Sequence, residues 1–525
     1  MSLDKFLSNL HADTDKSRPP DWEIDWEDAP LTYKLYRSLP VVPLSSEVPL
    51  TLERRESPAN TDLTTIGHLL WHVYGLAQLS QNSAAKSVNL SAGPVQMYRR
   101  FIPSGGGLYP NELYVYLKTM NTPYGIYHYD AAHHRLVLLR EGNFDSYLAR
   151  TLGNRCDMSH CFCTVFVSVM FWKNFYKYND FAYRLQGLDS GVLIGQLLEV
   201  TKRFGYESGV YFQYLDRAVN HLLGISENEE SVYAVIPLSM EPAINWFYGG
   251  NYGNGEVAAV DLCRELPGVQ HEHFIRSKKV KEYPMLAKMN EESMLDSTER
   301  FRYDVTENHV DSGMRSVFMP RVERLSYDLA SICRNRYSPE SDFVLSKLNA
   351  STVASLLQEA TASFYYYNDL KGPHKKSVPR LSLYCCMYNV EGIPDGAYRY
   401  DGASHKLHRI LPGDHRFRLQ EGMSLDNVNL FQIPLCMHVA GEKDYFKSAL
   451  GYRGYRIQQM EAGMLVQHLL LAASAIGMGG RPLLGYNPSF CDEIYDLAHY
   501  GKTSLIQIPI GHYRNRPRLE GGLHS

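Results

Sequence analysis

A run of three glycines stands out in the segment RRFIPSGGGLYPNELYVYL, residues 99–117. It contains the four small residues Ser104, Gly105, Gly106 and Gly107. Glycine adopts backbone angles that other residues avoid, so this segment predicts a loop whose amide groups can lie close against a bound ligand. A tight turn before a strand explains the same composition without a ligand. A dinucleotide-binding turn is excluded, because Pro110 and a strand pattern follow the glycines where that motif requires a helix.

The elements that must position this loop occur twice in the chain. GIYHYD begins at residue 125 and returns as GAYRYD at 396, and the long segment that begins at 181 returns at 453. VIPL at 235 returns as QIPI at 507, so three matches share a spacing of 271 or 272 residues. Such long-range self-similarity predicts two copies of one domain. We expect a first domain over 1–240 with an N-terminal extension, a surface connector over 241–320 and a second domain over 321–525.

Each copy has the same order of expected elements. An early helix is predicted in TDLTTIGHLLWHVYGLA with Asp62 as N-cap, and in NASTVASLLQEATASFYY with Asn349 or Ser351. Alternating segments such as ELYVYLK and LSLYCCMY predict strands. A long helix with an apolar stripe and a final strand carrying Ile-Pro follow in each copy. The fold class is therefore α+β, with a mostly antiparallel sheet flanked by helices in each domain.

Composition excludes several classes of function. The 525 residues carry a formal net charge of −4, so no basic field is available to bind nucleic acid. The nine cysteines lack zinc-type spacing, and the histidines of HEH at 271–273 lack a helix-spaced partner, so no metal site is predicted. The polar N-terminus and the lack of a long apolar run predict neither a signal peptide nor a membrane span. We expect a cytoplasmic protein with reduced thiols.

The glycine loop also carries a family resemblance. PSGGGLYPNELYV (103–115) resembles the signature of flavin-dependent azoline dehydrogenases, the streptolysin-type and microcin-type branch of the nitroreductase superfamily. WEDAPLTYKLYRSLPVVPL (26–44), KYNDFAYR (177–184) and the segment 451–486 are similar to other parts of that branch. The resemblance covers most of both copies but not the connector. It implies a dimer with FMN in the interface, which a tandem repeat would build as a pseudo-dimer within one chain.

The parts of such a flavin site are divided between the copies. The resemblance assigns the Ser-Gly loop to one partner, and to the other an early basic segment, a glycine turn after the long helix and a C-terminal basic pair. Only the first copy keeps the loop, whereas the second keeps the residues Arg334, Arg336, Gly479, Gly480, Arg481, Arg514 and Arg516. Arginine binds phosphate in two-pronged fashion, although each arginine alone is equally an ordinary surface residue. Because the losses are complementary, we expect one FMN per chain.

The resemblance also assigns catalytic roles to Lys177 and Tyr178, which the second copy replaces by Ala449 and Leu450. Oxidation of a thiazoline or oxazoline removes a hydride to the flavin and a proton to a base. Lys177 can be that base only if burial or a neighbouring cation lowers its pKa. Tyr178 would orient the ring or share the proton. Without the resemblance, KNFYKYNDF is interpreted as an exposed aromatic and cationic segment at the end of a strand.

Three functions stay open. The first is an FMN-dependent dehydrogenase that converts azolines to azoles in a peptide or carrier-protein-bound intermediate, with a cyclodehydratase or an assembly-line module as partner. The second is an NAD(P)H-dependent nitro or quinone reductase of the same fold. The third is a flavin-free scaffold subunit of a biosynthetic complex.

Overall fold

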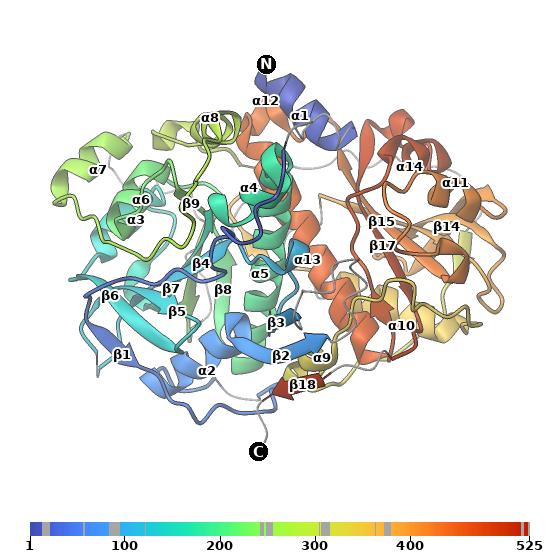
Figure 1. Ribbon diagram of the computed structural model, residues 1–525, viewed down its shortest axis with the longest axis horizontal. Coiled ribbons are helices and arrows are strands. Elements are labelled where there is room, and N and C mark those ends of the chain that lie inside the picture. Colours follow the sequence, from blue (N-terminus) through green and yellow to red (C-terminus); the bar gives the residue numbers. More distant parts are fainter. Residues whose placement is uncertain are drawn as a thin grey trace.

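The chain folds into two lobes that lie side by side (Figure 1). The computed structural model describes residues 1–12, 22–55, 58–82, 95–120, 122–241, 246–247, 256–303, 305, 316–362, 364–371, 380–515 and 519–522. Helices α5 (Ala182–Phe204) and α13 (Arg453–Ala475) pack against each other at the seam between the lobes. These are the two long helices that the repeat predicts.

The first lobe is built on an eight-stranded sheet. Its order is β1 (Val41–Pro43), β6 (Arg135–Glu141), β5 (Gly125–Asp130), β4 (Asn111–Leu117), β7 (Cys161–Met170), β9 (Glu230–Ser239), β8 (Glu207–Val210) and β11 (Tyr367–Asn368). All neighbours are antiparallel except β8 and β11. Strand β11 comes from the second copy, so the first sheet is completed across the seam.

The second lobe repeats this topology with seven strands. Its order is β10 (Ser316–Phe318), β14 (Lys406–Pro412), β13 (Gly396–Asp401), β12 (Ser382–Met387), β15 (Leu435–Glu442), β17 (Lys502–Gly511) and β16 (Gly479–Gly480). All neighbours are antiparallel. The repeated segments occupy equivalent places, with GIYHYD as β5 and GAYRYD as β13. The predicted α+β tandem architecture is confirmed.

Helices cover the sheets. The early pair is α2 (Leu63–Tyr74) and α10 (Ala350–Ala362). The first turn of α2 is capped by Asp62, which accepts a hydrogen bond from Thr65 N at 2.8 Å, and that of α10 is capped by Asn349. The others are α1 (Leu3–Ala12), α3 (Asp145–Thr151), α4 (Trp172–Tyr178), α6 (Asp216–Leu223), α7 (Ala259–Glu265), α8 (Pro284–Glu292), α9 (Leu329–Asn335), α11 (Arg416–Glu421), α12 (Lys447–Leu450) and α14 (Pro488–Ile494). The predicted Asp62 cap is confirmed, and of the two alternatives for the second helix the structure selects Asn349.

Backbone contact holds the seam together. A Cβ atom added to Gly191 of α5 would lie 1.9 Å from Met460 O of α13, and one added to Gly463 would lie 2.1 Å from Leu188 O. Side chains are thus excluded where the helices cross, and the two backbones touch. This fixes the relative position of the lobes, and therefore of any residues that face each other across the seam.

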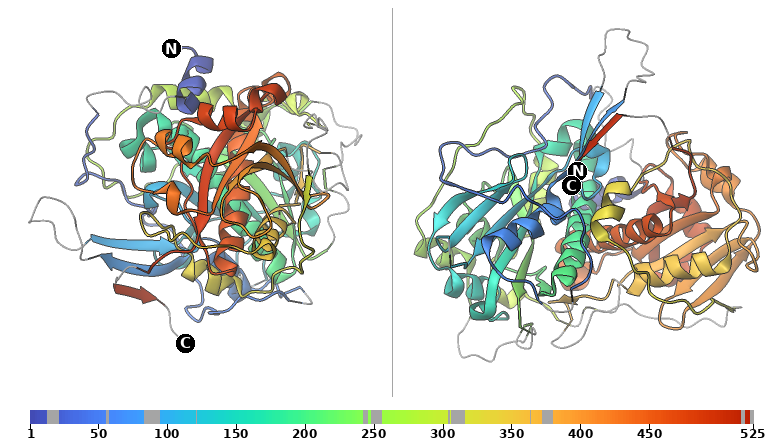
Figure 2. Two further views of the ribbon diagram at one scale, coloured as in Figure 1. Left: turned by 90° about the vertical axis from the view of Figure 1, so that its right-hand side faces the viewer. Right: turned by 90° about the horizontal axis from the view of Figure 1, so that it is seen from below.

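The ends of the chain are exchanged between the lobes. Strand β18 (Leu519–Gly522) pairs with β2 (Leu76–Asn82), which pairs with β3 (Val95–Arg100) in a small sheet that projects from the molecule (Figure 2). Helix α1 contacts the second lobe, where His11 Nε2 lies 2.8 Å from Thr503 Oγ1. The connector also belongs to the fold, because Leu262, Leu295 and Phe301 are buried in the first lobe and not draped over its surface.

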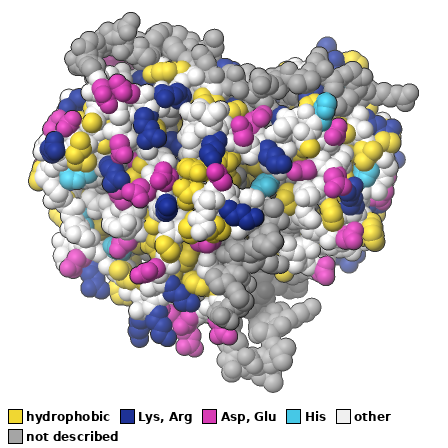
Figure 3. All heavy atoms as spheres, turned by 90° about the horizontal axis from the view of Figure 1, so that it is seen from above, with side chains coloured by type: hydrophobic (Ala, Val, Ile, Leu, Met, Phe, Trp, Pro, Cys, Tyr) yellow, Lys and Arg dark blue, Asp and Glu magenta, His cyan; other side chains and the backbone are white. Residues whose placement is uncertain are grey.

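The surface is mixed in charge. Acidic and basic side chains alternate across the upper face (Figure 3). Within the described ranges, no helix combines the length and the apolar composition needed to cross a lipid bilayer.

Candidate functional site

The glycine loop lies between β3 and β4 and is anchored to helix α5. Ser104 Oγ donates to Asp189 Oδ2 at 2.6 Å, and Gly105 N donates to Asp189 Oδ1 at 3.1 Å. Ser104 Oγ also accepts from Tyr109 N at 2.9 Å. Gly106 and Gly107 have φ values of 67° and 70°, which L side chains rarely adopt. The loop is therefore held in a shape that its glycines make available.

Asp189 is the acidic partner that the sequence did not single out. Burial raises its pKa to about 6, although the Ser104 hydroxyl and the Gly105 amide both favour the charged form. The helical pattern of α5 could not indicate the role of Asp189, because that role depends on a loop about 85 residues earlier in the chain. A carboxyl group beneath the loop thus titrates close to neutral pH.

Lys177 and Tyr178 end helix α4 directly beside Gly106. A Cβ atom on Gly106 would lie 2.5 Å from Tyr178 Oη and 2.9 Å from Lys177 Nζ. Only glycine allows this approach. Burial lowers the pKa of Lys177. Burial also raises the pKa of Tyr178 to about 12, with a smaller contribution from Asp189, so this phenol keeps its proton at neutral pH.

The second lobe reaches the same place through Arg481. Its positive charge acts on Tyr178 across the seam and opposes the rise in the pKa of that phenol. Arg481 Nη2 lies 3.0 Å from Glu340 Oε1, and Nη1 donates to Ser338 O at 3.2 Å. The guanidinium is therefore fixed within the second lobe while it faces a residue of the first.

Gly479 and Gly480, which form β16, are required by packing. A Cβ on Gly479 would lie 2.5 Å from Pro339 Cγ, and one on Gly480 would lie 2.7 Å from Leu470 Cδ2. Both contacts are internal to the second lobe. The strand therefore runs close against the segment that follows Arg336.

Arg336 is a buried cation without an acidic partner among the described residues. It is 6% exposed, Nη1 donates to Ser338 Oγ at 3.2 Å, and Nε has no hydrogen-bond partner. Arg99 of the first lobe donates to Arg336 O at 2.5 Å. Burial, and then the charge of Arg99, lowers the pKa of Arg336 to about 10. Within the described part of the chain no carboxylate forms an ion pair with Arg336, so an anion from outside would be stabilised here.

The other arginines that the resemblance assigns to the site do not all lie at the seam. Arg334 is half-buried in the last turn of α9 and lies close enough to His72 to oppose its protonation. Arg514 is exposed, and its backbone N donates to Asp342 O at 3.0 Å. Arg516 lies outside the described residues. The structure thus brings Arg336 and Arg481 to the seam with the glycine loop, Lys177 and Tyr178, and leaves Arg514 at the surface beside them.

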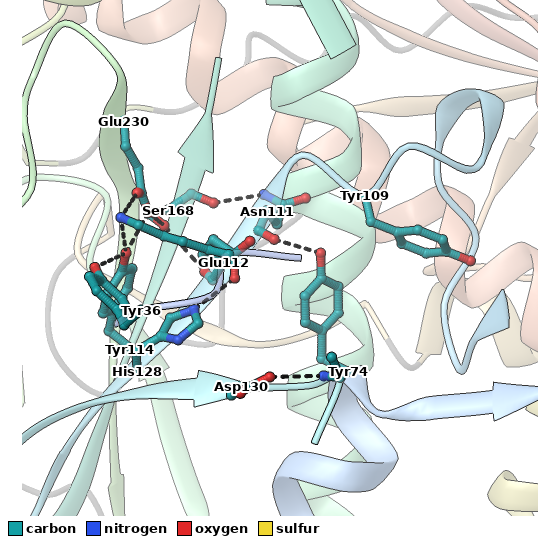
Figure 4. Close-up of polar contacts among 12 residues, drawn as sticks. Tyr36, Tyr74, Tyr109, Asn111, Glu112, Tyr114, His128, Asp130, Ser168 and Glu230 are labelled. Atoms are coloured by element: carbon teal, nitrogen blue, oxygen red, sulfur yellow. Dashed lines mark hydrogen bonds and ion pairs between the residues drawn. The ribbon is translucent and has the colours of Figure 1, made fainter. Parts of the chain in front are cut away.

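A buried polar network lies behind the loop (Figure 4). Lys173 Nζ donates to Tyr109 O at 3.3 Å and pairs with Glu112, whose Oε2 lies 2.8 Å from His128 Nε2. Although burial raises the pKa of Glu112, Lys173 and His128 hold it below its ordinary value. A neighbouring group joins Glu230 to Lys34 at 2.6 Å. The network holds Tyr109, whose φ of 48° is rare for a non-glycine residue. No sequence motif indicated it.

Strand β8 of the first lobe, which corresponds to β16, is covered by other parts of the chain. A Cβ on Gly209 of β8 would lie 2.6 Å from Phe247 Cζ and 2.9 Å from Trp246 Cε3. Strand β11 pairs with the same residue, and the Asp369 carboxylate accepts from the backbone N of Phe212 and of Gln213, each at 2.9 Å. The edge that corresponds to β16 is therefore covered by aromatic rings and a strand.

Comparison with known proteins agrees with this architecture. Residues 58–238 match the model of the nitroreductase family. A crystal structure of an Anabaena variabilis protein, provisionally named a nitroreductase, is 20% identical, covers 98% of this chain and 99% of its own, and has a TM-score of 0.73. The chain thus contains a nitroreductase-family domain, and its whole length has the fold of the Anabaena protein.

Two further matches are partial. A Methanocaldococcus jannaschii protein, also provisionally named a nitroreductase, is 25% identical over 133 residues, which is 25% of this chain and 64% of that protein. The match thus spans just under two thirds of the relative. A chain of the E. coli microcin synthetase McbBCD complex with truncated pro-MccB17 bound is 21% identical over 40% of this chain and 80% of that chain. Its TM-score of 0.29 is too low to support an inference.

Proposed function

We propose that this chain is an FMN-dependent oxidoreductase with one flavin site, at the seam where Gly106, Lys177 and Tyr178 of the first lobe face Arg336 and Arg481 of the second. The observation that carries the proposal is this placement of complementary parts on a rigid two-lobed fold. The mirror position, covered by Trp246, Phe247 and β11, supports a ratio of one flavin per chain.

The residues present fit FMN. The buried Nε of Arg336 without a partner suits a phosphate, with Arg99, Arg334, Arg514 and Arg516 as further cations. The missing side chain of Gly106 lets Lys177 and Tyr178 lie directly against the loop, so both groups would stand at the edge of a ring bound there. Ser104, Gly105, Gly107, Gly479, Gly480 and Arg481 would line the rest of the site. Bound FMN supplies the hydride acceptor.

The reaction that we propose is oxidation of a thiazoline or oxazoline to the azole in a peptide or carrier-protein-bound intermediate. Lys177 Nζ, with its lowered pKa, takes the proton that leaves a ring carbon. Tyr178 stays protonated and donates a hydrogen bond to a ring heteroatom. A cyclodehydratase or an assembly-line module, which forms the azoline, would be the partner that supplies the substrate.

A second candidate function is an NAD(P)H-dependent nitro or quinone reductase. The names of the Anabaena and Methanocaldococcus proteins favour it. It uses the same flavin site, but it requires no base at Lys177, because the flavin is reduced by nicotinamide and the acceptor takes up protons from water.

One experiment separates the alternatives. Flavin is quantified per chain, and turnover of a thiazoline peptide is compared for wild type, Lys177→Ala and the control Lys288→Ala at an exposed site. We expect one flavin per chain and a loss of about 100-fold or more for Lys177→Ala alone, with unchanged flavin content. Two flavins per chain or full activity of Lys177→Ala would contradict the proposal. Rapid reduction of the bound flavin by NADPH without azoline turnover would support the reductase. A colourless protein, which holds no flavin, would support the flavin-free scaffold subunit.

A further inference from the structure

The N-terminal segment forms a strap over the helix that carries Lys177. This strap, residues 22–28, lies against α4 through two tryptophans. Trp22 Nε1 donates to Tyr176 O at 3.1 Å, and the Trp22 ring meets the Phe175 ring edge-on at 5.6 Å. The Trp26 ring meets Tyr176 edge-on at 6.3 Å. The strap therefore follows the same helix that ends at the candidate base.

The connector fixes the strap in place. The Asp28 carboxylate accepts from Lys278 N at 2.7 Å and from Lys279 N at 2.9 Å. Ser277 Oγ donates to Asp28 O at 2.7 Å, and Trp172 Nε1 of α4 donates to the same hydroxyl at 2.9 Å. These bonds join the strap, the connector and α4 in one unit. The position of Trp26 relative to Lys177 is thus determined by structure on both sides.

Trp26 is exposed where a tryptophan is usually covered. Its side chain is 58% exposed, whereas the neighbouring Phe175 and Tyr176 are buried. Lys177 Nζ lies 5.3 Å from the centre of the Trp26 ring and 5.0 Å from that of Tyr178. Gly106 stands on the third side of the amino group. An exposed indole that is held in place on both sides offers a flat apolar surface on which a planar ring can stack.

We propose that Trp26 forms an aromatic subsite that binds the planar heterocycle of the substrate and holds it beside Lys177. This rests on the proposed function. Stacking on an indole strengthens as a ring becomes flat and aromatic, so the contact favours the state that follows proton loss over the puckered azoline. Three exposed acidic residues lie near Trp26 in the sequence, Glu23, Asp25 and Glu27, so a neutral or cationic peptide segment fits better than an acidic one.

The subsite is tested with Trp26→Ala and with the conservative Trp26→Phe. Steady-state kinetics with a thiazoline peptide should show KM raised about tenfold for Trp26→Ala and within threefold of wild type for Trp26→Phe. Flavin content should be unchanged in both, since the ring contacts of Trp26 among the described residues are with Tyr176 and Lys177 and not with the loop or the arginines. Equal KM values for wild type and Trp26→Ala would overturn the subsite.

A second readout does not depend on azoline turnover. Acetylation of Lys177 by N-hydroxysuccinimide acetate is followed by peptide mass spectrometry, with Lys281, which lies 3.8 Å from the Trp22 ring centre, as internal control. Trp26→Ala should raise the rate at Lys177 about fivefold and leave Lys281 unchanged, because it uncovers one amino group only. Thiazole-4-carboxamide should protect Lys177 in wild type and not in Trp26→Ala. If wild type and Trp26→Ala show equal acetylation rates at Lys177, or equal protection by thiazole-4-carboxamide, the subsite is overturned. If these differences are found but the enzyme does not turn over an azoline, only the proposed function is refuted.

Discussion

Gly106→Ala tests the site at its closest contact. The substitution places a Cβ 2.5 Å from Tyr178 Oη and 2.9 Å from Lys177 Nζ, where ordinary contact begins at 3.4 Å. Tyr178 must therefore retreat by about 1 Å, and a misplacement of that size in a catalytic group costs on the order of 100-fold in rate. The backbone adds its own cost, because alanine at a φ of 67° loses about 1–2 kcal/mol.

Gly107→Ala is the matched control. Its φ of 70° imposes the same backbone cost, but its added Cβ would meet only Met97 Cε, at an ordinary 3.6 Å. Both variants should therefore lose about 1–2 kcal/mol of unfolding free energy in urea titrations. Because Gly107 is also proposed to line the flavin site, turnover of the thiazoline peptide is compared per bound flavin, and on that basis only Gly106→Ala should lose about 100-fold.

The two variants are compared at matched flavin occupancy, so that cofactor loss is not mistaken for a misplaced side chain. If both lose activity equally, backbone strain in the loop explains the result and the contact with Tyr178 is irrelevant. If Gly106→Ala retains full turnover, neither Tyr178 nor Lys177 acts where the geometry places them.

Three further predictions concern the seam. Arg336→Met should weaken flavin binding by about 10- to 100-fold without lowering unfolding free energy, because it removes a buried cation that forms no ion pair within the described residues. Flavin titration and urea denaturation check both quantities, and unchanged affinity would refute the phosphate site. Gly191→Ala should destabilise the protein by about 3 kcal/mol or more, whereas Gly195→Ala, whose Cβ would first meet Gln467 Cβ at 3.3 Å, should cost less; equal melting temperatures would argue against backbone contact at the seam. Asp189 has its pKa raised from 3.8 to about 6, so it binds more protons when folded and its stability contribution falls as pH rises from 4 to 6. The difference in unfolding free energy between Asp189→Asn and wild type should therefore shift by about 2.5 kcal/mol in favour of the variant from pH 4 to pH 7. A difference that does not change with pH would contradict the raised pKa.

The sequence predicted the parts of the fold that depend on local pattern. Alternating apolar residues predict strands and capping residues such as Asp62 predict helix starts, each from a few neighbouring positions. The repeat supplied each of these patterns twice. The alternative interpretation of the segment around Lys177, an exposed end of a strand, is wrong, because the segment forms helix α4 after β7 and Phe175 and Tyr176 are buried. The expected connector surface was also wrong in part, since Phe301 and its neighbours complete a core that belongs to the first copy.

What sequence could not provide is contact between distant residues. Asp189 looks like any polar residue in a long helix, and its role follows only from where the glycine loop lies. The roles of Arg99 and Lys173 likewise follow only from their contacts with Arg336 and Glu112, respectively, which lie on other elements. Strand β11 is two residues long, too short for any periodicity. The domain limits stay a prediction, as do the flavin and the catalytic pair, which flavin titration and the substitutions at Lys177 and Gly106 test.

The exchanged ends of the chain change how the site depends on concentration. A site shared by two separate subunits is lost on dilution, because its halves dissociate. Here β11, β18 and α1 each fasten one half to the other within a single polypeptide, so the partner is present at a fixed, high local concentration. Separate subunits encoded by one gene must also change together, whereas tethered copies accumulate substitutions independently. One face could therefore be covered by Trp246 and Phe247 while the opposite face kept the groups that we propose bind flavin.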